Sequence, residues 1–364
     1  VGFCHHHAHA GRPAHKQLRP TRHPQNHWRP GPQHNPGLAC HVWPCQPAQS
    51  AQLIDLFHCV IMTYPCQYYR IAGMTIRVDS DLPITDTTFN SAINQFRVAA
   101  PGVDNIAIHH HFALPDLSDF RLGEEIYRKS PWAIYQQPNG WLYLGISPDM
   151  DDKTLHQMAF FNPDHTLSQI YTPMSDAFMQ GNLHALTLFP TDQILIARLL
   201  ADRQGCYLHS AGAILNDAGI LFIGHSGAGK STTAQMLMQA SAQGRADVEI
   251  LCDDRNIVRW QHGTWQTYGS WSHGDLPDVS STSAPLRAIC FLHQSSENKL
   301  IPITDPKTIF HQLLACVIKP LVTKDWWQKT LDIVHQLSTE VACYSMHFDR
   351  SNAILSDLEK ICKI

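Results

Sequence analysis

A run of glycine, lysine and serine residues at 224–232, GHSGAGKST, has the composition and spacing of a site that binds phosphate. Four residues meet the pattern G-x-x-x-x-G-K-[ST]: Gly224, Gly229, Lys230 and Ser231. In such a loop the backbone N–H groups form a concave anion site, which a Cβ would obstruct. Residues 220–224 predict a strand and residues 232–240 a helix, the context that the pattern requires. The alternative is an ordinary glycine-rich turn between a strand and a helix.

We expect the whole loop to contact the phosphates of a nucleoside triphosphate, through Gly224, His225, Ser226, Gly227, Ala228, Gly229, Lys230, Ser231 and Thr232. Lys230 would neutralise the β- and γ-phosphates, and the Ser231 hydroxyl would bind Mg²⁺. The helix that follows adds the positive end of its dipole. The sequence therefore predicts a nucleotide site that uses Mg²⁺.

Two consecutive carboxylates, Asp253 and Asp254, end the next predicted strand at 248–254. A Mg²⁺ ion held opposite Ser231 requires one carboxylate at this place. The second carboxylate is then free to accept a proton from an attacking hydroxyl group. The alternative is that the second aspartate caps the chain or forms a salt bridge, for instance with Arg255.

The elements from residue 191 to the end alternate between strands and helices and predict an α/β domain at 191–364. Strands are predicted at 206–215, at 220–224 and at 341–348, with helices beginning near Thr191, at Asp305–Pro306 and near Thr323, and a last helix at 352–362. The first helix is expected to stop at Gly205. Because only four residues join 206–215 to 220–224, these two strands are expected to form an antiparallel hairpin.

Residues 62–190 predict a smaller, mostly β domain. The segments with strand-forming patterns are 68–78, 105–114, 131–137 and 140–146, and a hairpin turn is expected at 138–140. His109 and His111 would share one face of a strand, which permits metal binding. Because the chain has 24 histidines, hydrogen-bonded or exposed side chains are the favoured interpretation, and no site is assigned there.

The beginning of the chain, residues 1–61, predicts a disordered tail. Residues 1–54 contain no Asp or Glu, eight prolines and nine histidines, too little apolar surface to offset the entropy of ordering. The HHHAHA run at 5–10 is either a metal-binding tract or, since the first residue is Val, part of a translated upstream sequence or fragment.

Composition argues against several classes of partner. A formal net charge of −4 is unfavourable for binding nucleic acid. No apolar run approaches 18 residues, so no membrane span is expected. The eleven scattered cysteines are typical of reduced thiols in a cytoplasmic protein. Association into a homo-oligomer is left open.

The runs LHSAGAILNDAGILFIGHSGAGKST and ILCDDRNIV resemble the catalytic domain of HPr kinase/phosphorylase and the HPr-kinase-like proteins related to it. The resemblance covers about 200–350 and is strongest over 207–258. YGSWSHGDLP (268–277) and APLRAICFL (284–292) are similar to segments of an HPr-kinase-like subgroup. The resemblance to HPr kinases implies an α/β P-loop catalytic domain of the kind shared with ATP-dependent phosphoenolpyruvate carboxykinases. The smaller, mostly β region ahead of it does not clearly match the usual N-terminal domain of HPr kinases.

The resemblance also implies ATP and Mg²⁺ as cofactors, and transfer of the γ-phosphate to a hydroxyl, a serine of a protein or peptide. Asp253 matches the acid/base that deprotonates the acceptor serine, and Asp254 with Ser231 matches the metal ligands. His209 matches a histidine close to the transferred phosphate, whereas from the sequence alone it is a lone histidine on a strand. With Lys230, these residues form the predicted catalytic set. His273 and Arg287 lie in the segments similar to the HPr-kinase-like subgroup, and their match to that family is weaker.

The sequence departs from the HPr kinase pattern, because the glycine-rich protein-docking segment expected after the catalytic strands is not found. HPr is therefore not the expected acceptor. One alternative is an ATP-binding regulatory or biosynthetic-accessory module without turnover. A less favoured one is carboxykinase-like activity, for which no stretch places the arginine for oxaloacetate or the Lys/His pair for Mn²⁺.

Overall fold

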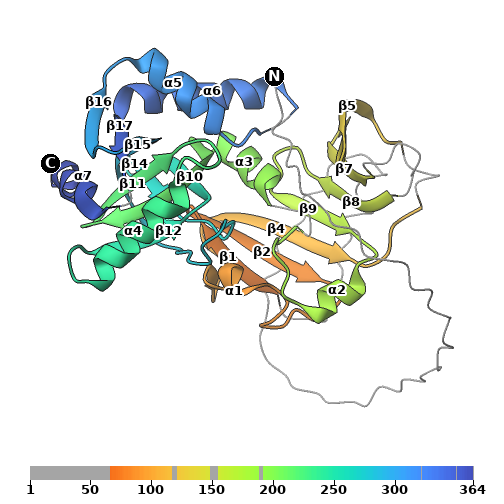
Figure 1. Cartoon of the computed structure of the whole chain (residues 1–364). Helices are drawn as coiled ribbons and strands as arrows, with labels where there is room; N and C mark the ends of the chain where they lie inside the picture. The colour runs from red at the N-terminus through yellow and green to blue at the C-terminus, as the bar shows by residue number, and fades with distance from the viewer. Residues whose placement is uncertain are drawn as a thin grey trace, which may run out of the picture. The chain divides into compact units, whose positions relative to one another are not determined.

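Two β-sheets with flanking helices make this a mixed α/β protein (Figure 1). The computed structural model describes residues 66–116, 121–147, 155–187, 192–320, 322–349 and 351–363. The predicted tail at 1–61 lies outside the described residues, so its expected disorder stays a prediction.

The first sheet has nine strands in the order β3-β1-β2-β4-β9-β8-β7-β6-β5. Its strands are β1 (Gln67–Ile71), β2 (Met74–Ser80), β3 (Arg97–Val98), β4 (Asp104–His111), β5 (Glu124–Lys129), β6 (Trp132–Gln137), β7 (Gly140–Ile146), β8 (Leu155–Phe161) and β9 (Leu167–Tyr171), with short helices α1 (Ser91–Asn94) and α2 (Ser175–Gln180). β4 runs parallel to both of its neighbours, β2 and β9. The other pairs in this sheet are antiparallel.

The prediction of one strand over 68–78 is wrong, since this segment is the β1–β2 hairpin. Ala72 and Gly73 both have positive φ angles, 48° and 78°, and form a two-residue turn between Ile71 and Met74. The run of strand-forming residues is continuous in the sequence, so only the glycine marks the reversal.

The second sheet has eight strands: β10 (Gly205–Leu215), β11 (Ala218–Ile223), β12 (Val248–Cys252), β13 (Arg255–Gln261), β14 (Thr264–Tyr268), β15 (Ser283–Gln294), β16 (Lys299–Ile303) and β17 (Ala342–Phe348). β10 and β11 form the predicted antiparallel hairpin. β11, β15 and β17 are parallel. β12 is antiparallel to β10 and therefore runs in the same direction as β11.

Helices cover both faces of the second sheet: α3 (Gln193–Ala201), α4 (Lys230–Ala242), α5 (Pro306–Cys316), α6 (Lys324–Glu340) and α7 (Leu355–Cys362). Residues of α4 and α7 form one hydrophobic cluster with Phe222 of β11, and residues of α5 and α6 form another with its neighbours Leu221 and Ile223. Alternate side chains of β11 therefore enter opposite layers, as the two-residue period of a strand requires.

Two of the predicted helix starts are confirmed. The Asp305 carboxylate caps α5 by accepting from the N–H groups of Lys307 and Thr308, and the Thr323 hydroxyl caps α6. The prediction that the first helix stops at Gly205 is wrong, because α3 ends at Ala201 and Gly205 begins β10. Gln204, with φ of 52°, makes the turn instead. Thr191, its predicted cap, lies outside the described residues.

Residues of the two sheets share a hydrophobic cluster that includes Tyr69 of β1 and Tyr207 of β10. Polar contacts connect the same parts of the chain: Arg203 forms an ion pair with Asp104, and Arg259 Nη1 donates to the Ala72 carbonyl at 2.6 Å. Because the two parts pack together in this way, the division into domains at 190/191 stays a prediction.

Among the described residues, no helix combines the length and the apolar character needed to cross a membrane. The described cysteines are all free thiols: Cys66, Cys206, Cys252, Cys290, Cys316, Cys343 and Cys362. The predicted cytoplasmic location stays a prediction.

Acid is expected to destabilise the fold through His110, which is fully buried on β4. Its Nε2 lies 2.8 Å from the Leu186 carbonyl, and burial lowers the pKa of His110 to about 3. Between pH ~6.5 and ~3 the unfolded chain binds a proton that the folded chain does not, so stability falls as pH falls. From this group alone we expect a loss of about 2 kcal/mol in unfolding free energy between pH 7.5 and pH 5.

Urea unfolding at the two pH values measures this loss. His110→Gln keeps a donor for Leu186 but removes the titrating ring, so the variant should lose less stability than the wild type over the same pH step. An equal loss in both proteins would contradict the prediction.

Candidate functional site

The glycine-rich loop connects the end of β11 to the beginning of α4 (Figure 1). Gly227 and Gly229 have φ angles of 81° and 107°, which favour glycine. At Gly229 a Cβ would also lie 2.8 Å from the ring of Phe348. Of the nine predicted phosphate contacts, the first six lie in this loop and Lys230, Ser231 and Thr232 form the first turn of α4. The predicted strand–loop–helix context is therefore confirmed, and nucleotide binding stays a prediction.

Lys230 folds back onto its own loop. Its Nζ donates to the carbonyl oxygens of Gly224 and His225 at 3.1 and 3.4 Å. Burial lowers the pKa of Lys230, and the nearby charges of Asp254 and Asp253 oppose that shift. The side chain thus holds its ammonium group within the loop, where a bound phosphate would need it.

Asp253 and Asp254 interrupt a strand rather than end one. β12 pairs with residues 212–215 of β10, and β13 pairs with residues 205–209 of the same strand. The two aspartates separate β12 from β13, and Ser210 N donates to the Asp254 carbonyl at 3.0 Å between the two paired stretches. This break in the ladder places both carboxylates beside β10, near its residue His209.

Two residues that were not predicted from the sequence, Asn256 and Gly212, stabilise this break between β12 and β13. Asn256 Nδ2 donates to the carbonyl oxygens of Ser210 and Cys252 at 2.7 and 3.0 Å, and so bridges β10 and β12. Gly212 leaves the room for it, because a Cβ there would lie 2.4 Å from Asn256 Oδ1. A glycine inside a strand marks a close approach of this kind, so Gly212 carried a signal.

The Asp253 carboxylate is 1% exposed and accepts three hydrogen bonds. Ser231 Oγ donates to Oδ2 at 3.0 Å, Gly274 N to Oδ1 at 2.7 Å, and Leu276 N to Oδ2 at 3.0 Å. The Ser231 hydroxyl, which was predicted to bind the metal together with Asp254, thus contacts Asp253. The backbone donors at 274–276 were not anticipated, because loop N–H groups leave no mark in side-chain patterns.

The Asp254 carboxylate contacts His209 on one side and Arg255 on the other. His209 Nε2 lies 2.9 Å from Asp254 Oδ1, and Arg255 forms an ion pair with Oδ2. Although partial burial acts to raise it, the hydrogen bond from His209 and the charge of Arg255 lower the pKa of Asp254. The salt bridge considered as an alternative for the second aspartate is therefore present, together with the contact to His209.

The two weaker candidates differ in position. His273 is partly buried and precedes Gly274, whose N–H binds Asp253, so it lies at the border of the site. Arg287 is exposed on β15, next to Leu286, which pairs with Gly219 at the start of β11. Because the glycine-rich loop follows the other end of β11, the structure does not bring Arg287 to the site.

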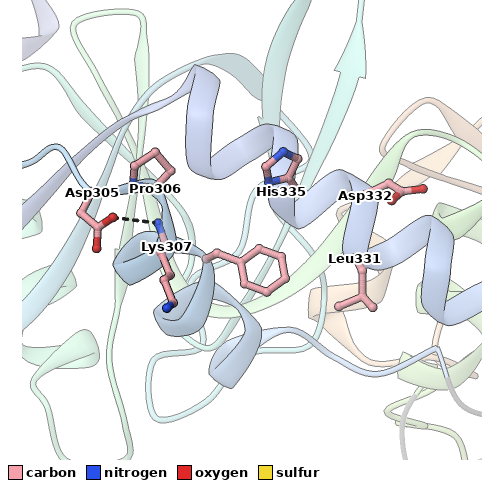
Figure 2. Close-up of a pocket in the computed structure, with 7 residues that line it drawn as sticks. Asp305, Pro306, Lys307, Leu331, Asp332 and His335 are labelled. Carbon is pink, nitrogen blue, oxygen red and sulfur yellow. Dashed lines mark hydrogen bonds between the residues drawn. The ribbon is translucent and has the colours of Figure 1, made fainter.

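A cavity of about 250 Å³ lies beside the loop, at the ends of β15 and β17, lined by Gly229, Thr232, Gln294, Ser295, Phe348 and Asp349. A wider hollow of about 650 Å³ lies between the start of α5 and α6. Figure 2 shows residues that line this wider hollow, among them Lys307, Asp332 and His335. None of the predicted site residues lines this hollow. The hydrogen bonds that Asp305 forms there cap the N-terminus of α5. The hollow is larger, but charged side chains converge at the glycine-rich loop, so we place the candidate functional site at the loop.

A family model described as SynChlorMet cassette protein ScmC matches residues 178–361, just over half of the chain. The chain belongs to the ScmC family. The match begins within α2 and ends within α7, so the ScmC region includes the glycine-rich loop, both aspartates and His209.

The curated proteins contain no match to this chain. Among solved structures, the Hpr(Ser) kinase/phosphatase from Coxiella burnetii is similar over 36% of this chain and 90% of its own, at 13% sequence identity and a TM-score of 0.22. A TM-score this low carries neither the fold nor the activity of that protein to this chain, so the resemblance to HPr kinases stays a prediction.

Replacing Asp253 by Asn is expected to destabilise the fold more than the same change at Asp254. The amide of Asp253→Asn has one acceptor oxygen, so its NH₂ group would face one of the backbone donors Gly274 N and Leu276 N. An unpaired buried donor costs about 1–3 kcal/mol. Asp254→Asn changes a partly exposed carboxylate and is the matched control. Urea unfolding compares the two, and equal losses would contradict the role given to the buried hydrogen bonds.

Proposed function

We propose that this protein binds ATP with Mg²⁺ and transfers the γ-phosphate to a hydroxyl group, a serine of a protein or peptide. The observation that carries the proposal is the hydrogen bond between Ser231 and Asp253 behind the glycine-rich loop, next to the separate pair of His209 and Asp254. Phosphoryl transfer needs one group of residues that holds the metal and another that receives the proton of the acceptor.

Ser231 and Asp253 are suited to hold the metal. Their oxygens are 3.0 Å apart, and adjacent ligands of an octahedral Mg²⁺ with bonds of 2.0–2.1 Å are about 2.9 Å apart. Lys230 supplies a second positive charge within the loop. Mg²⁺ and Lys230 would together neutralise the β- and γ-phosphates, which is the main contribution that a protein makes to this reaction.

Asp254 and His209 are suited to the acceptor side. The His209 side chain is 36% exposed and that of Asp254 20%, so both can be reached by a hydroxyl group from solvent. With its lowered pKa, Asp254 is ionised at neutral pH, so its carboxylate can accept a hydrogen bond from a hydroxyl group beside His209. Asp253, in contrast, is 1% exposed and already accepts three hydrogen bonds.

These contacts support an exchange of the two roles that the resemblance to HPr kinases implies. Asp253 would bind the metal together with Ser231, and Asp254 would serve the acceptor. The physical reason is accessibility, because a general base must come within hydrogen-bond distance of the proton that it removes.

A second candidate is an ATP-binding accessory protein without turnover. It is favoured by the description of its family, which names a cassette and no activity. Incubation with γ-labelled ATP, Mg²⁺ and serine-containing peptides separates the two candidates. Labelled peptide supports the kinase, and nucleotide binding without transfer or hydrolysis supports the accessory protein.

Lys230→Ala is expected to weaken ATP binding by about 10- to 100-fold, because a hydrogen bond to a charged group contributes about 1.5–3 kcal/mol. Titration with fluorescent ATP measures the affinity. Lys307→Ala, an exposed lysine on α5, is the matched control and should bind ATP like the wild type. Unchanged affinity in Lys230→Ala would refute the phosphate site.

Asp254→Asn is expected to reduce phosphoryl transfer by about 10²- to 10⁴-fold, the usual contribution of a general base, while Mg²⁺-dependent ATP binding persists. Asp253→Asn should instead weaken the dependence of ATP binding on Mg²⁺. Labelled-peptide formation and ATP titrations with and without Mg²⁺ measure both effects. Loss of transfer in Asp253→Asn with intact Mg²⁺ dependence would favour the roles implied by the resemblance.

A further inference from the structure

Three consecutive histidines on β4 divide between the two faces of the first sheet. Successive strand residues point to opposite sides, so His109 and His111 share one face and His110 lies on the other. His110 is buried and contacts the Leu186 carbonyl. His109 and His111 are only partly buried, and their rings lie 4.5 Å apart. Two imidazoles therefore stand side by side on a face that solvent reaches.

A carboxylate from the neighbouring strand completes the group. β2, β4 and β9 are adjacent and parallel, so their carboxyl ends meet at one edge of the sheet (Figure 1). Asp81 directly follows β2, and its N–H donates to the His110 carbonyl at 3.0 Å. This backbone contact fixes Asp81 beside the two histidines. The sequence alone indicates no site at His109 and His111, because the third side chain, Asp81, lies 28 residues before His109.

The three side chains converge on a small volume. Asp81 Oδ1 lies 2.9 Å from His109 Nε2, and Asp81 Oδ2 lies 2.8 Å from His111 Nδ1. Their ligand atoms all lie within 4.8 Å of one another. Adjacent ligands of a metal with bonds of about 2.0–2.1 Å are themselves about 3 Å apart, so small shifts of the side chains admit an ion. Asp81 is 41% exposed, which leaves the remaining coordination positions open to water.

The hydrogen bonds of His111 point to a cation at this place. Its Nε2 lies 2.6 Å from the Gln169 side-chain oxygen, and its Nδ1 faces the Asp81 carboxylate. Both partners are acceptors, so either both ring nitrogens carry a proton or one of them faces a metal ion. A metal ion at Nδ1 satisfies both contacts, because Nε2–H then donates to Gln169 and the Nδ1 lone pair binds the metal. An outer partner of this kind commonly orients a metal-binding histidine.

We propose that Asp81, His109 and His111 bind one divalent transition-metal ion of the class of Zn²⁺. Two imidazoles and one carboxylate are a common ligand set for such ions. Imidazole nitrogens disfavour Mg²⁺, which prefers oxygen ligands, so this site is distinct in chemistry and place from the proposed Mg²⁺ site at Ser231. Asp79, on the same face and paired with Arg77, contributes little net charge to the site.

Zinc titration of the full chain, monitored by equilibrium dialysis, tests the proposal without ATP. The nine histidines of residues 1–54 are the same in every variant, so any zinc that they hold cancels in the comparison. Wild type should bind one more Zn²⁺ per chain than Asp81→Asn or His111→Gln. Both variants keep the approximate size of the side chain, and circular dichroism verifies that they fold.

Loss of a ligand should weaken this site by at least about 100-fold, since changes to outer partners such as Gln169 already weaken metal binding about 10- to 100-fold. His262→Asn is the matched control, because His262 is exposed in a turn with φ of 54°, which Asn adopts readily. It should bind as many zinc ions as wild type. Zn²⁺ should also raise the melting temperature of wild type more than that of Asp81→Asn. Equal zinc binding in wild type, Asp81→Asn and His111→Gln would overturn the proposal.

Discussion

The three hydrogen bonds at Asp253 are the constraint on which the candidate site depends. They connect the first turn of α4, the end of β12 and the segment 274–276, which are distant in the sequence. A buried carboxylate without such donors would be strongly destabilising, so these segments must stay together for the fold to hold. The geometry of the glycine-rich loop is therefore tied to the stability of the second sheet.

The sequence was sufficient where a local pattern has a local cause. The glycine-rich loop between a strand and a helix, the β10–β11 hairpin and the caps at Asp305 and Thr323 all follow from short-range signals. The sequence was insufficient where contacts between residues far apart in the chain determine the local structure. The interruption between β12 and β13 depends on Asn256 filling the space that Gly212 leaves, and the contact of Ser231 with Asp253 depends on how the chain turns there. Neither can be seen in spacing alone.

The two groups of polar side chains discussed above arise from the same geometric rule. In both sheets, strands that run in one direction bring their carboxyl ends to a common edge, and side chains from separate segments meet there. At the second sheet this edge carries the loop with Lys230, and at the first it carries Asp81 beside His109 and His111. Their chemistry differs because oxygen donors predominate at one edge and imidazoles at the other.

The fold of Lys230 back onto the carbonyl oxygens of Gly224 and His225 has a consequence for selectivity. An anion that bound in this loop would have to exchange with the two carbonyl oxygens that already accept hydrogen bonds from the ammonium group. A singly charged anion gains little from that exchange, whereas a polyphosphate gains the full charge of several oxygens at once. In the proposed site, the loop would therefore favour polyphosphates over anions that carry a single charge.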